Sequence, residues 1–165
     1  MKLEKTVLKA MNEQINKEIF SSYLYLSMSA WCESEGYPGC AKWLKVQSEE
    51  ENEHAMKIYH FIHERGGRVE LDAIDKPKGE FSTLSKLFGM VLEHEQKVSA
   101  SITALYETAM KANDYPTQIM LQWFITEQVE EEKNSNEVVD LLKKVGDSTV
   151  NLMMFDRQMG ARTEK

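Results

Sequence analysis

Residues 68–81 read Arg-Val-Glu-Leu-Asp-Ala-Ile-Asp-Lys-Pro-Lys-Gly-Glu-Phe, and this stretch, which lies between two long helical patterns, decides the fold. It is far longer than the roughly 2 to 8 residues that usually join neighbouring antiparallel helices. Fourteen extended residues span roughly 46 Å, about the length of a 30-residue helix. The stretch therefore predicts a crossover along the full height of a helical bundle, which leaves the helices before and after it parallel.

Four long helices and a short fifth are expected around this crossover. Ten Met with only 8 Gly and 3 Pro indicate an all-α chain. The prolines and glycines separate periodic segments and so predict helices over about residues 3–35, 41–64, 83–113, 117–145 and 148–159, with Ser82 as the N-cap of the third. Residues 1–165 are then a single domain, with the four-helix bundle in 1–145 and the short helix and tail in 146–165.

The composition excludes several classes of protein. The chain has 27 acidic against 20 basic residues, and its net charge of −7 opposes nucleic-acid binding and suits cations. No apolar run approaches about 18 residues and the first residues are charged, so we expect no membrane span, no signal peptide and a cytoplasmic location. Cys32 and Cys40 do not have the spacing of a zinc or redox motif and are expected to be reduced thiols.

Polar residues interrupt the apolar inward face of each long helix near its middle. On the third helix, the heptad-like spacing gives Leu84, Phe88, Val91, Glu95, Val98, Ile102 and Leu105. The interruptions on the other helices are Glu18 on the first, Gln47, Glu51 and His54 on the second, and Gln128, Glu131 and Ser135 on the fourth. Because a buried carboxylate costs several kcal/mol unless a cation balances it, four together predict bound metal. Carboxylates with one imidazole and no thiolate favour two iron or manganese ions over a structural zinc.

The interruptions also follow an internal repeat. Two pairs share a separation of 33 positions: Glu18 with Glu51, and Glu95 with Gln128. His54 and Glu131 each follow three positions later, so that each half of the chain is a hairpin with one ligand on its first helix and an i, i+3 pair on its second. A single buried Glu or His is more often a core polar residue or part of an ion pair. The repeated spacing favours the metal site.

Four segments carry a resemblance to a known family: residues 12–18 (Asn-Glu-Gln-Ile-Asn-Lys-Glu), 50–54 (Glu-Glu-Asn-Glu-His), 94–96 (His-Glu-Gln), and 121–124 (Leu-Gln-Trp-Phe) with 127–132 (Glu-Gln-Val-Glu-Glu-Glu). The chain resembles prokaryotic non-haem ferritins along essentially its whole length. This implies a ferritin-like four-helix bundle with a long crossover between helices two and three and a short fifth helix. It also implies a ferroxidase centre with the ligands Glu18, Glu51, His54 and Glu95, in which Glu51 bridges two irons.

The resemblance assigns roles to further residues around this centre. Gln128 lies beside it, Glu131 is an additional glutamate ligand, Tyr25 is a tyrosine that hydrogen-bonds near it, and Trp123 is a nearby aromatic. Glu50, Glu127 and Glu130 correspond to a third iron site towards the storage cavity, although exposed glutamates beside an inward face are often simply solvated. His94 neighbours Glu95, is expected to point away from the inward face, and is assigned no role.

Haem is not expected as a cofactor. Bacterioferritins carry a haem-ligating methionine directly after the bridging glutamate, and this chain has Asn52 there. Rubrerythrins add a four-cysteine iron domain, which two separated cysteines cannot supply. Iron in a dinuclear centre, with a third site beside it, is therefore the metal that the resemblance implies.

Iron storage is the implied function. Fe(II) is oxidised to Fe(III) by dioxygen or hydrogen peroxide, and the ferric mineral is kept in a hollow homo-oligomer of 24 subunits. Tyr25 could hold an oxidised intermediate or orient Glu95, and residues 152–155 (Leu-Met-Met-Phe) are expected to pack between subunits. Two other functions stay open: a soluble di-iron oxidase or oxygenase without storage, which needs an apolar channel, and a structural assembly in which the glutamates pair with basic residues.

Overall fold

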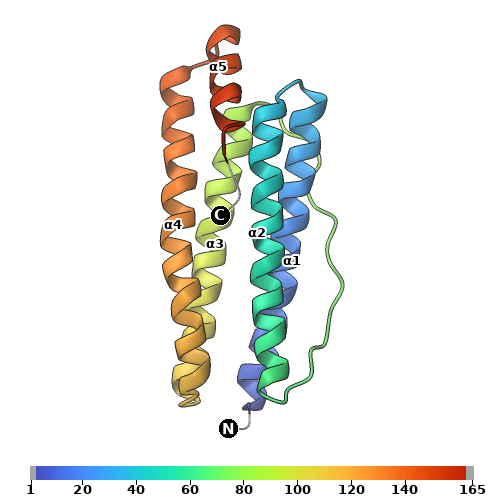
Figure 1. Ribbon diagram of the computed structural model, residues 1–165, viewed down its shortest axis with the longest axis vertical. Coiled ribbons are helices and arrows are strands. Elements are labelled where there is room, and N and C mark those ends of the chain that lie inside the picture. The colour runs from blue at the N-terminus through green and yellow to red at the C-terminus, as the bar shows by residue number, and fades with distance from the viewer. Residues whose placement is uncertain (1–2, 163–165) are drawn as a thin grey trace.

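The computed structural model describes residues 3–162, and this part of the chain is helical without any strand (Figure 1). The helices are α1 (Lys5–Ser34), α2 (Pro38–Glu64), α3 (Leu84–Lys111), α4 (Tyr115–Val145) and α5 (Thr149–Met159). The four long helices form an elongated bundle and α5 lies at one end of it, which confirms the predicted fold class. The ends of the predicted domain, residues 1–2 and 163–165, lie outside the described residues. None of the described helices is both long and apolar enough to cross a membrane.

The hydrophobic core consists of two clusters with a polar layer between them. One cluster lies at the α5 end of the bundle and contains Met28, Leu44 and Phe88. The other lies towards the opposite end and contains Ile58 and Ile102. On all four long helices, buried polar residues at mid-length separate the positions that belong to the two clusters. Burial of the apolar clusters stabilises the bundle. Burial of the polar layer costs free energy, so another interaction must compensate for it.

Helix α5 is fixed to the bundle because it caps another helix. Asp156 accepts hydrogen bonds from the backbone amides of Gly39 at 3.1 Å and Cys40 at 2.8 Å, in the first turn of α2. The N-cap residue of α2, Tyr37, makes no side-chain cap, so Asp156 supplies the missing acceptor where the helix dipole favours a negative charge. Phe155 packs into the adjacent core cluster. Cys40 is a buried free thiol.

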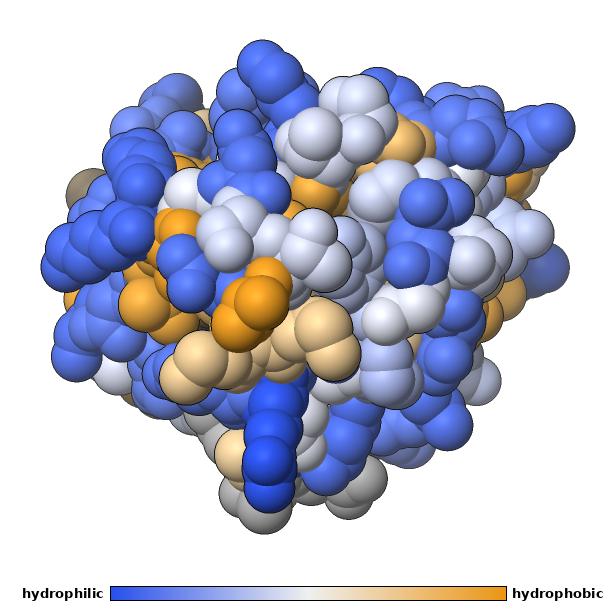
Figure 2. Space-filling view, turned by 90° about the horizontal axis from the view of Figure 1, so that it is seen from above, coloured by the Kyte–Doolittle hydropathy of each residue, from blue (hydrophilic) through white to orange (hydrophobic). Residues whose placement is uncertain are grey.

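The outer side of α5 is apolar and exposed. Val150, Met153 and Met154 are 66%, 66% and 69% exposed. Figure 2 shows hydrophobic residues on this end face of the bundle among strongly hydrophilic side chains. Leu152 and Phe155 pack against the core instead, because they lie on the opposite side of the helix. Of residues 152–155, which were expected to pack between subunits, only Met153 and Met154 are therefore exposed.

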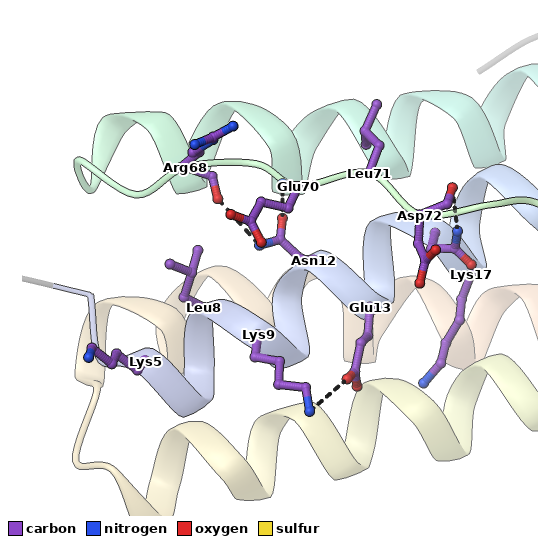
Figure 3. A pocket seen from close by; sticks show the side chains of 11 residues that line it. Lys5, Leu8, Lys9, Asn12, Glu13, Lys17, Arg68, Glu70, Leu71 and Asp72 are labelled. Carbon is purple, nitrogen blue, oxygen red and sulfur yellow. Dashed lines mark hydrogen bonds and ion pairs between the residues drawn. The ribbon is translucent and has the colours of Figure 1, made fainter.

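The connection between α2 and α3 runs beside α1 along the bundle, so that α2 and α3 are parallel, as predicted (Figure 1). Two asparagines one turn apart on α1 bind the first half of this connection through hydrogen bonds. Asn12 donates to the carbonyl of Arg68 at 3.3 Å and accepts from the amide of Glu70 at 3.1 Å (Figure 3). Asn16 donates to the carbonyl of Ala73 at 3.0 Å. These contacts border a surface cavity of about 650 Å³ between α1 and the connection.

All five helix starts differ from the sequence prediction, by about one to three residues. Helix α2 begins at Pro38, about three residues earlier than expected. Helix α4 begins at Tyr115, about two residues earlier than expected, and has Pro116 in its first turn. Proline is accepted there because the first-turn amides have no partner within the helix. The predicted N-cap of α3 was wrong by one position: Thr83, and not Ser82, accepts a hydrogen bond from the amide of Lys86 at 3.1 Å.

We expect Gly39→Ala to lower the thermal unfolding midpoint. An added Cβ would lie 1.8 Å from the backbone oxygen of Asp156, so α5 would have to shift. Overpacking of this kind typically costs about 1–3 kcal/mol. Circular dichroism melting measures the loss. Gly89→Ala is the matched control, since a Cβ there meets nothing within 4 Å and alanine favours the helix by about 1 kcal/mol. An unchanged midpoint for Gly39→Ala would contradict the proposed close packing.

Candidate metal centre

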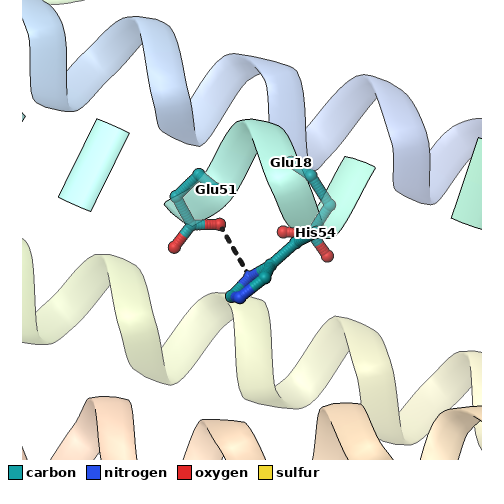
Figure 4. A group of neighbouring side chains, drawn as sticks. All are labelled: Glu18, Glu51 and His54. Carbon is teal, nitrogen blue, oxygen red and sulfur yellow. Dashed lines mark ion pairs between the residues drawn. The ribbon is translucent and has the colours of Figure 1, made fainter. Parts of the chain in front are cut away.

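Three predicted ligands from α1 and α2 converge in the polar layer (Figure 4). Glu18, Glu51 and His54 each place one ligand atom within 4.8 Å of the others, and all three side chains are buried. Nδ1 of His54 lies 3.5 Å from Oε2 of Glu51. Within residues 3–162, no other group of three or more His, Cys, Asp and Glu side chains is as close. The i, i+3 pair on α2 and Glu18 on the neighbouring α1 thus form a compact site.

Hydrogen bonds satisfy only part of these carboxylates. Gln14, one turn before Glu18 on α1, donates to Oε1 of Glu18 at 2.8 Å. Oε2 of Glu18 and both oxygens of Glu51 are buried and receive no hydrogen bond from an amide, hydroxyl or amine of the described residues. Such atoms are rare in native proteins because desolvation is not compensated. Several carboxylate oxygens that point to one place are the ligand atoms that a hard cation prefers.

Glu95 reaches the same polar layer from α3, and neutral donors hold both of its oxygens. The hydroxyl of Tyr25 donates to Oε1, and Nε2 of Gln128 donates to Oε2 at 3.2 Å. Gln128 also lies within 3.3 Å of the backbone oxygen of Glu95. The hydrogen bond from Tyr25 is the contact that this tyrosine needs in order to orient the Glu95 carboxylate. Glu95 does not belong to the compact group of three ligands.

The remaining predicted ligands lie at different depths. Glu131 of α4 is buried and accepts from Nε2 of Gln47 at 2.7 Å. Glu50 and Glu127 are half-buried, and Glu130 is exposed. The structure does not bring Glu50, Glu127 and Glu130 together as closely as the three ligands on α1 and α2.

Burial raises the pKa of three carboxyls in this layer. The pKa values of Glu18 and Glu51 lie well above the usual range, first because of desolvation and then because of neighbouring carboxylates. Burial also raises the pKa of Glu95, to about 7. The metal-free layer therefore retains protons near neutral pH. A divalent cation would take their place, because it stabilises the ionised form of each carboxyl.

Sequence reasoning missed some contacts around the centre. Gln14 was not singled out, although it precedes Glu18 by four positions and the i, i+4 spacing could have revealed it. Gln47 was placed on the inward face, but its partner Glu131 lies on another helix and no spacing along the chain indicates it. His94 was expected to have no role. Its Nε2 instead lies 2.7 Å from the hydroxyl of Ser21, and its ring contacts that of Tyr25 edge-on at 5.6 Å. His94 therefore packs behind the tyrosine that holds Glu95.

Trp123 lies next to the imidazole ligand, as an aromatic close to the centre. Its ring centroid is 5.3 Å from that of His54, in an edge-on arrangement. Nζ of Lys57 lies 4.2 Å from the centroid of the same ring, within the range of a cation–π interaction. The indole therefore contacts both the imidazole of His54 and the ammonium of Lys57.

We expect the metal-free protein to lose stability, relative to Glu95→Gln, as the pH rises through the window between 4.5 and about 7. In this window the unfolded chain has released the Glu95 proton and the folded chain still holds it. The stabilising contribution is thus complete at low pH and is lost as the pH approaches the folded pKa. At about 1.4 kcal/mol for each pKa unit, the loss amounts to about 3 kcal/mol.

Denaturant unfolding with a chelator present, at several pH values from about 5 to 8, measures this difference. Burial lowers the pKa of His94 to about 4, so its contribution has the opposite sign and is lost as the pH falls. Both proteins carry His94, and the difference between them removes that contribution. A difference in unfolding free energy that stays constant with pH would contradict the raised pKa of Glu95.

Comparison with known proteins agrees with this geometry. The profile of the ferritin-like domain family matches residues 8–145. The bacterial non-heme ferritin of Staphylococcus aureus (strain USA300) is 38% identical over 161 residues, which cover 98% of this chain and 97% of that protein. The bacterial non-heme ferritin of Staphylococcus epidermidis is also 38% identical, with the same coverage.

Solved structures give the same result. A closed form of the Archaeoglobus fulgidus ferritin, engineered by site-directed mutagenesis, superposes with a TM-score of 0.97 at 40% identity and covers 99% of both chains. The open-pore ferritin from the same archaeon has a TM-score of 0.96 at 40% identity, over 98% of this chain and 99% of that one. The chain therefore belongs to the ferritin family, and it is similar to bacterial non-heme ferritins over nearly its whole length.

Proposed function

We propose that this chain oxidises Fe(II) in the polar layer of its bundle and stores the Fe(III) as a mineral inside a shell of identical subunits. The observation that carries the proposal is the buried group of Glu18, Glu51 and His54, in which three of the four carboxylate oxygens accept no hydrogen bond from the described residues. Membership of the ferritin family supports iron as the cation. The proposed compartment is the cytoplasm.

Glu18, Glu51, His54 and Glu95 are the proposed ligands of two substrate irons, with Glu51 between them. Anionic oxygen donors stabilise Fe(III) more than Fe(II), because the ion of higher charge gains more from them, and they thereby favour oxidation. Two Fe(II) ions lose one electron each, and dioxygen takes up these two electrons and two protons to give hydrogen peroxide. Protons released from Glu18, Glu51 and Glu95 as iron binds are available at the site for this step.

Residues next to this centre have supporting roles in the proposal. Glu131 is an additional ligand, and Gln128 and Tyr25 hold Glu95 in place through the hydrogen bonds to its two oxygens. Glu50, Glu127 and Glu130 form a third iron site, which receives iron on its way to the storage cavity.

A homo-oligomer, with 24 subunits as in the shells that the family resemblance implies, is the proposed assembly. The exposed apolar side of α5, formed by Val150, Met153 and Met154, supports contact with other subunits at this end of the bundle. The open-pore and closed forms of the Archaeoglobus fulgidus ferritin concern that protein's own assembly.

One observation favours a different function, a di-iron oxidase or oxygenase that acts on an organic substrate without storing iron. A cavity of about 310 Å³ between α3 and α4 reaches Gln128 and has Ile102, Ile125 and Val129 among its lining residues. It is small, and all the residues that line it belong to α3 and α4. Iron retention distinguishes this function from storage.

We expect the metal-free protein to bind Fe(II) anaerobically and, on exposure to air, to oxidise it rapidly and retain far more iron than its binding sites can hold. Stopped-flow absorbance measures the oxidation, and iron analysis after gel filtration, together with the mass of the assembly, measures retention. Oxidation without retained iron would favour the oxidase. Absence of Fe(II) binding would exclude both metal functions.

We expect Glu18→Ala combined with His54→Ala to slow the rapid oxidation by more than about 100-fold and to leave the assembly intact. Even changes outside the first ligand shell typically cost about 10- to 100-fold in metal affinity or activity. Glu13→Ala with His60→Ala is the matched control, since it removes an exposed Glu and an exposed His from the same two helices. Equal oxidation rates in the two double variants would refute the assigned centre.

A further inference from the structure

The C-terminal segment after α5 places a guanidinium at the edge of the polar layer. Arg162 forms an ion pair with Oε2 of Glu50 through Nη2 and donates from Nη1 to Oε1 of Gln47 at 2.8 Å. Its guanidinium carbon lies 4.4 Å from the centroid of the Trp43 ring. The side chains of Arg162 and Glu50 are only 16% and 13% exposed. An ion pair with this little solvent is screened less than a surface pair.

Gln47 connects this guanidinium to a buried carboxylate of the centre. A guanidinium only donates, so the amide oxygen of Gln47 must face Arg162. The amide nitrogen of Gln47 then faces Glu131 and donates to its Oε2 at 2.7 Å. Arg162 thus holds Glu50 directly and orients, through Gln47, the donor to Glu131. Both carboxylates belong to the set proposed for iron.

We propose that Arg162 is a positioning residue that occupies the place of the third cation, so that iron can use Glu50 only after it displaces the guanidinium. This inference rests on the proposed function, because it concerns the third iron site of the same centre. A guanidinium stays charged at every physiological pH, so it cannot release Glu50 by losing a proton. Only a competing cation or a movement of the C-terminal segment can release it.

The structure offers room for the displaced side chain. A cavity of about 290 Å³ between α2 and α4 is lined by Arg162 itself, together with Trp43, Asn134 and Glu137. The carboxylate of Glu137 is exposed. A guanidinium that leaves Glu50 can therefore enter the cavity and face another anion. Glu137 already pairs with Lys133 at 3.8 Å, so the displaced guanidinium would share this carboxylate, and a metal ion of higher charge can win at Glu50.

The fold does not depend on this ion pair. Asp156 holds α5 on the first turn of α2 through two backbone amides, and Phe155 and Met159 pack into the core cluster there. Removal of the Arg162 charge therefore leaves α5 attached. A change in metal binding can be separated from a loss of structure.

The test is calorimetric titration of the metal-free assembly with Zn(II), which binds carboxylate and imidazole ligands and is not oxidised. We expect wild type to bind two cations per subunit tightly and a third weakly. Arg162→Gln is expected to strengthen only the third, by about tenfold, which corresponds to about 1.4 kcal/mol of competition. Arg162→Lys keeps the charge and should hold the third affinity close to that of wild type. This rescue separates competition by charge from a loss of packing.

Arg157→Gln is the matched control, because it removes the same charge from an exposed position on α5 and should change nothing. A third affinity in Arg162→Gln that lies within twofold of wild type, or below it, would overturn the inference. The first two cations report on the centre independently: their absence in wild type would refute the proposed function, and their presence beside an unchanged third would refute only the role of Arg162.

Discussion

The burial of several carboxylates at one level of a narrow helical bundle is the constraint on which the rest of the structure depends. Each ionised group loses its hydration there, and its neighbours include other carboxylates of the same layer. Protons reduce the cost in the metal-free protein, which is why burial raises the pKa of Glu95 to about 7. The layer also divides the core, so two apolar clusters must stabilise the bundle from either side. A site that is unfavourable when empty is one in which cation binding releases the most free energy.

Long-range contacts adapt the bundle to this layer. The connection along α1 makes α2 and α3 parallel (Figure 1). The buried polar residues of both hairpins lie in one layer between the two core clusters. Helix α5 caps α2 through Asp156, which brings the chain end back to the bundle. Arg162 then contacts Glu50, and through Gln47 it orients the donor to Glu131. Arg162 thus interacts electrostatically with the carboxylates of the polar layer, although it lies outside the four-helix bundle.

Most of the fold and the inward positions of the proposed ligands could be predicted from local patterns. Heptad spacing places Glu18, Glu51 and Glu95 on inward faces, because the helical period fixes which residues share a face. The start of α3 was misplaced by one residue because Ser82 and Thr83 are both good N-caps and only the local hydrogen bond distinguishes them. His94 was misjudged for another reason: its neighbour along the chain faces inward, yet its own ring packs against Tyr25 from the adjacent helix.

The sequence by itself determined the helices, the parallel crossover and the polar positions at mid-height, since all of these follow from periodicity and chain length. Only the tertiary structure decided which carboxylates meet. It groups Glu18, Glu51 and His54, attaches Glu95 to Tyr25, and places Arg162 on Glu50 across 112 positions of sequence. No local pattern encodes these pairs, because they depend on how the rotations of separate helices and the path of the C-terminal segment combine once the bundle is packed.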